Sequence, residues 1–110
     1  MTLYEYMQDC KDEEITVWDV DYDMETYFYK NTSNDEWDKA MVDLAKVLNV
    51  VEFNNHGVTV DLSSQIEKNL DKMTDLFNVC EIDAVMDGID LILAGYVSEK
   101  WLTKFVEALK

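Results

Sequence analysis

Four carboxylates spaced by two residues come closer to a chemical site than any other pattern in this sequence: Asp19, Asp21, Asp23 and Glu25. In an EF-hand calcium loop, the first three would occupy the first, third and fifth positions. The sixth position of such a loop requires glycine and the twelfth glutamate, but this sequence has Met24 and Lys30 there. A calcium loop is therefore not expected.

The segment from Ile15 to Tyr22 also resembles the strand-end Asp-x-Asp signature of the haloacid dehalogenase-like phosphotransferases. The resemblance implies that Asp19 would be the nucleophile and Asp21 a general acid. It covers only a few residues, however. That family's fold needs a far longer chain with alternating strands and helices and further catalytic positions, so phosphoryl transfer is not expected either.

The remaining residues with reactive side chains suggest no catalytic site. His56 is the only histidine and stands beside Gly57, where a turn residue is expected rather than a base. Cys10 and Cys80 lie 70 positions apart and match no paired metal or redox spacing, so we expect two free thiols. We therefore predict a protein that is not an enzyme and has no metal or cofactor.

The net charge of -15 excludes direct nucleic-acid binding and is unevenly distributed. All nine basic residues are lysine, whereas a protein that neutralises phosphates needs a basic surface. Residues 1–38 carry a net charge of -10 and residues 39–110 a net charge of -5. With 48% hydrophobic and 12% aromatic residues, the chain is not a disordered acidic tail. The acidity therefore belongs to a folded domain and concentrates in its first third.

The carboxylates from Asp19 to Glu25 have two interpretations. They can be a solvated strand edge and turn that keep a sheet soluble and block edge pairing. Alternatively, they form an anionic stripe, because residues two apart in a strand lie about 6.6 Å from each other on one face. Such a stripe could occupy the basic groove of a nucleic-acid-binding protein, as DNA does.

Aromatic residues accompany these acids: Tyr4, Tyr6, Trp18, Tyr22, Tyr27, Phe28 and Tyr29. Strand alternation puts Tyr27 and Tyr29 on one face and Phe28 on the other, so a two-layer domain cannot bury them all. Core packing accounts for most of them. A tyrosine left outside among carboxylates would be an anchor for a protein partner.

The elements that position these groups follow from local patterns. Strands are expected at Ile15 to Asp21, Glu25 to Lys30, Val50 to Phe53 and Val58 to Leu62, paired as two hairpins with turns at Tyr22 to Met24 and at residues 54–57. Capping-box pairs at Thr2 and Glu5, Ser33 and Glu36, and Ser64 and Glu67 predict three helices. Asp83 and Ser98 are expected to cap two more, the first ending near Gly95.

These elements predict one small α+β domain over residues 1–110, with antiparallel hairpins packed against helices and a helical C-terminal half. The apolar faces near the C-terminus, including Trp101 and Phe105, are expected in its core, and any surplus could serve a homodimer. Neither a membrane span nor a secretory signal is apparent. A cytoplasmic location in a bacterial host cell is therefore expected.

The small size, the all-lysine basic set, the opening Met1-Thr2-Leu3 and the segment ITVWDVDYDMETYFY resemble the small acidic accessory proteins of phages and conjugative elements of low-GC Gram-positive bacteria. Some proteins of that kind are anti-CRISPR or antirestriction factors. The likeness is one of style, closest over about the first thirty residues. Since anti-CRISPR proteins share no motif, it implies no functional residue.

We hypothesise that the protein inhibits a nucleic-acid-binding defence enzyme, such as a CRISPR effector nuclease, by occupying its basic DNA-binding surface. The expected contact residues are seven acids and two tyrosine anchors: Asp12, Glu13, Glu14, Asp19, Asp21, Asp23 and Glu25, with Tyr22 and Tyr27. The alternative is a non-enzymatic structural or regulatory module, dimeric or monomeric, whose acidity serves solubility.

Overall fold

The N-terminal segment forms the expected helix and β-hairpin. The computed structural model describes residues 1–11, 13–20, 25–30, 35–54, 57–78, 82–95 and 98–110. In it, α1 spans Leu3–Asp9, β1 spans Glu14–Asp19 and β2 spans Glu25–Tyr29. The Thr2 hydroxyl accepts a hydrogen bond from the Glu5 amide, and the Glu5 carboxylate accepts one from the Thr2 amide. The predicted capping box is therefore confirmed, whereas the turn expected at Tyr22 to Met24 lies outside the described residues.

Two hairpins combine into one mixed sheet. β3 (Val50–Asn54) and β4 (Gly57–Val60) pair antiparallel, as do β1 and β2, and the strand order is β2-β1-β4-β3. The central pair, β1 with β4, is parallel. The antiparallel pairing of both predicted hairpins is confirmed, but Asn54 and Gly57 lie in the strands rather than in the turn, and Leu62 belongs to a helix. The parallel junction of the hairpins was not predicted, because it depends on how the chain crosses between them through α2 (Glu36–Val47).

The helix α2 begins later than the sequence suggested. Its N-cap is Asp35, whose side chain accepts a hydrogen bond from the Trp37 amide at 2.8 Å. The expected cap was Ser33, which lies outside the described residues. Asp35 and Ser33 are both good capping residues, so composition could not decide between them.

Four helices rather than three make up the described C-terminal half: α3 (Leu62–Lys68), α4 (Leu70–Phe77), α5 (Ile82–Leu93) and α6 (Glu99–Leu109). The helix expected from Ser64 begins at Leu62 behind an Asp61 cap and breaks at Asn69. Asp83 lies within α5 rather than before it. Gly95 follows α5 with a φ of +81°, as predicted.

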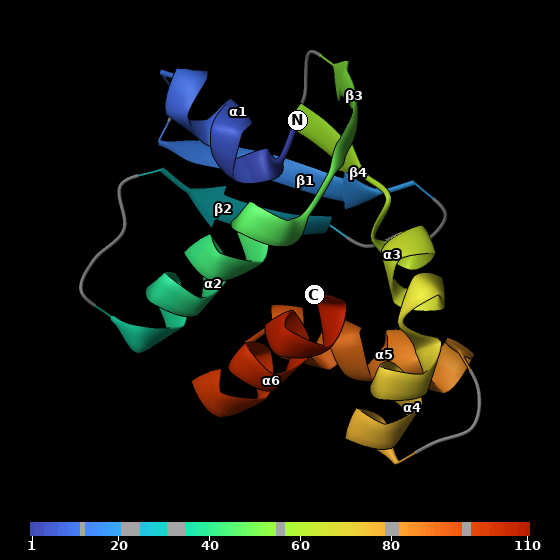
Figure 1. The fold of residues 1–110 in the computed structure, drawn as a ribbon. Coiled ribbons are helices and arrows are strands. Elements are labelled where there is room, and N and C mark those ends of the chain that lie inside the picture. The colour runs from blue at the N-terminus through green and yellow to red at the C-terminus, as the bar shows by residue number, and fades with distance from the viewer. Residues whose placement is uncertain (12, 21–24, 31–34, 55–56, 79–81, 96–97) are drawn as a thin grey trace.

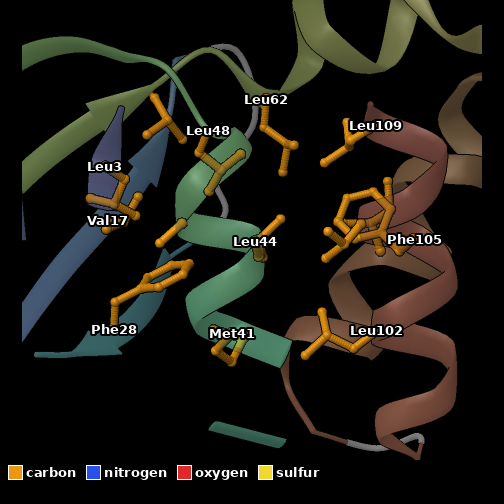
Figure 2. Close-up of a cluster of buried hydrophobic side chains, with 14 of the residues drawn as sticks. Leu3, Val17, Phe28, Met41, Leu44, Leu48, Leu62, Leu102, Phe105 and Leu109 are labelled. Carbon is orange, nitrogen blue, oxygen red and sulfur yellow. The ribbon is translucent and has the colours of Figure 1, made fainter. Parts of the chain in front are cut away.

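The helices pack on one face of the sheet, with α1 and α2 next to the strands and α3–α6 beyond them (Figure 1). Figure 2 shows α2 between the sheet and α6, with Phe28 and Val17 on one side of it and Leu102 and Phe105 on the other. These four side chains are buried. The chain is thus a compact α+β domain with one continuous hydrophobic core.

The predicted C-terminal core is confirmed in part. Phe105 is fully buried. Trp101 is 39% exposed and stacks on Phe77, with ring centroids 6.4 Å apart. Among the described helices, none is both long enough and apolar enough to cross a membrane.

Candidate partner-binding face

The face of the sheet turned away from the helices carries acids and aromatic rings. We call it the outer sheet face, and it consists of Glu14, Thr16 and Trp18 of β1, Glu25, Tyr27 and Tyr29 of β2, Glu52 of β3 and Thr59 of β4. The strand registers place these residues opposite one another. Their neighbours in sequence, such as Ile15, Val17 and Phe28, point inward and are buried. The alternation of the strands therefore produces both faces.

The register of the hairpin brings acids and rings close together. Lys30 N–H donates to Glu13 O at 2.8 Å, so the pair Glu13 and Lys30 is a hydrogen-bonded pair of the ladder. The next pair, Glu14 opposite Tyr29, and the pair Trp18 opposite Glu25 are then non-hydrogen-bonded pairs. In such pairs the Cα atoms lie about 4.5 Å apart and the side chains are closest. Each acid of the hairpin on this face thus faces an aromatic residue.

Tyr27 is both exposed and fixed in orientation. Its side chain is 48% exposed, and its hydroxyl donates to Glu25 Oε1 at 2.6 Å. This hydrogen bond and the negative charge of Glu25 raise the pKa of Tyr27 above its ordinary value. The hydrogen bond from the phenol thus orients the Glu25 carboxylate.

Tyr29 is a second exposed ring that sequence analysis did not select as an anchor. It is 50% exposed, and the negative charge of Glu14 is the main cause of a raised pKa of Tyr29. The signal that could have identified it was present, because alternation puts Tyr29 on the same face as Tyr27. Glu52 was also missed, since the register of β3 cannot be read from the sequence.

Lys30, which follows β2, does not lie on the outer sheet face. Lys30 Nζ donates to the backbone carbonyls of Gln8, at 3.4 Å, and Cys10, both at the C-terminal end of α1. A cation there is favourable because the helix dipole leaves that end negative. Within the described part of the chain, the outer sheet face carries three carboxylates and no cation.

The prediction that Asp19 is an exposed contact residue is wrong. Asp19 is only 8% exposed and lies on the inward side of β1, so it cannot belong to an exposed anionic stripe. Its Oδ2 accepts a hydrogen bond from the Ser63 amide at 2.9 Å, and Asp61 Oδ1 accepts one from Ser64 at 3.1 Å. Both carboxylates thus cap the N-terminus of α3, where negative charge is stabilised.

The other predicted contact residues divide into two groups. Glu13, Glu14, Glu25 and Tyr27 are exposed, and the last three share the outer sheet face. The remaining four lie outside the described residues: Asp12, Asp21, Tyr22 and Asp23. His56 and Cys80 also lie outside them, while Cys10 is a free thiol.

The described residues form no cluster of metal ligands. No group of three or more His, Cys, Asp or Glu side chains among them is arranged to hold a metal ion. The chemistry available on the outer sheet face is recognition of cations, since carboxylates accept charge-assisted hydrogen bonds and tyrosine rings attract Lys and Arg.

A second exposed apolar group lies at the opposite edge of the sheet. Val51 and Phe53 of β3 are 55% and 52% exposed, and a register shift between Val50 and Glu52 displaces Val51 from the ladder. The Phe53 ring contacts Tyr6 of α1 at a centroid distance of 4.9 Å.

No family model, curated protein or solved structure matches this chain.

Proposed function

We propose that this protein is an acidic interaction protein of a phage or mobile genetic element that inhibits a nucleic-acid-binding defence enzyme, such as a CRISPR effector nuclease. In this proposal it acts in the cytoplasm of a bacterial host cell. It binds through the outer sheet face to the basic surface on which the enzyme would hold DNA.

One observation carries this proposal: an exposed sheet face that combines Glu14, Glu25 and Glu52 with the exposed rings of Tyr27 and Tyr29. Carboxylates on a rigid sheet attract a basic surface and speed association, whereas the rings supply contact area. Charge alone would give steering with little affinity. The combination supports binding to a protein that carries Lys and Arg on its own surface.

The negative charge of this protein would let it compete with DNA for the basic surface of the enzyme. A surface that binds DNA is basic and releases counterions when an anion covers it. The anionic N-terminal third of this protein would gain from the same release. Direct binding to nucleic acid is opposed by its net charge of -15. The biological setting of the proposal depends on the resemblance in sequence style to phage and mobile-element proteins.

The test is inhibition of DNA cleavage by a panel of Cas9-type effectors with their guide RNAs and of restriction nucleases. Replacing Glu14, Glu25 and Glu52 together by Gln should raise the concentration needed for half-inhibition by about tenfold or more, as expected for three contacts of about 0.5–1 kcal/mol each. Inhibition by the wild-type protein should weaken as salt rises.

The matched control replaces three exposed acids on helices, namely Glu67→Gln, Asp87→Asn and Asp90→Asn, which changes the net charge equally. This variant should inhibit like the wild type. Equal inhibition by both triple variants would show that the outer sheet face is not the binding surface. If no enzyme of the panel is inhibited, the proposed function is wrong.

The exposed apolar side chains of β3 support a second candidate, a non-enzymatic structural or regulatory module that dimerises and whose acidity serves solubility. Val51 and Phe53 are the observation that favours it, because exposed apolar side chains on an edge strand invite pairing with another chain. It predicts a dimer in light scattering that persists at high salt and is lost on Val51→Lys with Phe53→Lys.

A further inference from the structure

We infer that the outer edge of β2 accepts an extended segment of the partner as an added strand, with Lys or Arg side chains over the outer sheet face and apolar side chains in a cavity beneath β2. The identity of the partner rests on the proposed function. The acceptance of a strand does not, and it can be tested with a peptide.

The first argument is the direction of the backbone groups in β2. Since Glu13 and Lys30 form a hydrogen-bonded pair, Thr26 and Phe28 turn their N–H and C=O groups toward β1, and Tyr27 and Tyr29 turn theirs away. β2 is an edge strand of the sheet, and no strand of the described chain pairs with its outer edge. Such an edge is a template for an additional strand.

The second argument is a cavity directly beside this edge. About 350 Å³ of space lies between β2, α2 and the C-terminal end of α5. Its apolar wall includes Met7, Phe28, Trp37, Met41 and Leu93. The volume falls in the range of ligand pockets, about 300–1,000 Å³, so it can take side chains from one face of an added strand.

The third argument is the charge around the edge. Glu25 and Asp38 line the cavity together with Tyr27 and Tyr29, and no lysine is among its described lining residues. Side chains of an added strand alternate between its faces. One set would meet the carboxylates and rings of the outer sheet face, and the other would enter the cavity and pack against its apolar wall. The segment that suits the outer edge of β2 is therefore one in which cationic and apolar residues alternate.

The experiment titrates the isotope-labelled full-length protein with an eight-residue peptide of alternating Lys and Val. Amide hydrogen exchange at Tyr27 and Tyr29 should slow by about tenfold at a peptide concentration about ten times its Kd. Exchange at Thr26 and Phe28, which already bond to β1, should change less. A peptide with Glu in place of Lys should not bind.

Two modified peptides test for backbone pairing. In an antiparallel addition, residues opposite Tyr27 and Tyr29 share their face and exchange hydrogen bonds with them, so these residues are the lysines. N-methylation of the lysines should then abolish binding, and N-methylation of the valines should leave it intact. The reverse result would support addition in the parallel direction.

The outcomes separate this inference from the proposed function. If the Lys-Val peptide does not bind, or if it binds without protecting Tyr27 and Tyr29, the strand-accepting edge is wrong even when a nuclease is inhibited. If the peptide binds as expected and no nuclease is inhibited, the edge stands and the proposed function fails. Equal binding by both N-methylated peptides would also overturn the inference.

Discussion

The Asp19 carboxylate joins the end of β1 to the start of α3. It is buried, and it accepts a hydrogen bond from the Ser63 amide. Removing the carboxylate would leave the Ser63 amide without this acceptor inside the protein. A buried donor that lacks its hydrogen bond lowers the free energy of unfolding. The residue therefore serves stability, although its spacing from Asp21 and Asp23 suggested a contact residue.

We predict that Asp19→Ala lowers the free energy of unfolding by about 2 kcal/mol, the size of a strong cap or a charged hydrogen bond. Urea denaturation followed by circular dichroism measures the change. The control is Glu13→Ala at an exposed position, where a change within about 0.5 kcal/mol is expected. A stability loss no larger for Asp19→Ala than for this control would contradict the capping role.

At the scale of elements, the contact between β1 and β4 depends on a glycine. Gly57 has a φ of +148°, and a Cβ atom there would collide with the Thr16 carbonyl and lie 2.8 Å from Cζ3 of Trp18. The half-buried Trp18 ring thus rests against the backbone of β4. Only a residue without a side chain permits this approach.

Gly57→Ala should therefore be more destabilising than Gly95→Ala, by about 1–3 kcal/mol. Gly95 also has a positive φ, +81°, but a Cβ atom there meets nothing within 4 Å, so only backbone strain of about 1–2 kcal/mol is expected. Thermal unfolding of the two variants gives the comparison. Equal losses would contradict the close approach of Thr16 and Trp18 of β1 to Gly57.

The elements differ in how far their sequence predicts them. The Thr2 and Glu5 capping box and both hairpins follow from local chemistry, and alternation correctly separates Tyr27 from Phe28. The same alternation places Asp19 on the inward side with Ile15 and Val17, so its burial could have been predicted. The break at Asn69 and the parallel pairing of β1 with β4 could not, because both depend on packing between distant segments.

At the scale of the whole molecule, the net charge acts on folding and on binding in opposite directions. Ion pairs such as Lys46 with Asp43 and Lys110 with Glu107 are local and exposed, so they offset little of the repulsion among the acids. Folding brings these acids together, and salt at 0.1 M largely screens the repulsion between exposed acids that lie more than about 10 Å apart. Salt should therefore stabilise the fold while it weakens the proposed binding to a basic partner.

We predict that the melting temperature rises by about 5 °C between low and moderate salt, which corresponds to about 1 kcal/mol for a domain of this size. Differential scanning calorimetry at several sodium chloride concentrations measures it. The variant with Glu67→Gln, Asp87→Asn and Asp90→Asn should show a smaller rise, because it carries three fewer negative charges. A melting temperature that falls with salt would contradict this prediction.

The strict alternation of the β1–β2 hairpin also bears on how this protein can evolve. Ile15, Val17 and Phe28 pack in the core. The residues that alternate with them along the strands, such as Glu14, Tyr27 and Tyr29, contribute mainly to the outer sheet face. Mutations at these surface positions can accumulate with little loss of stability, so the chemistry of this face can change while the fold is kept. The same separation makes the hairpin a suitable surface for selecting new binders from a library randomised at its outward positions.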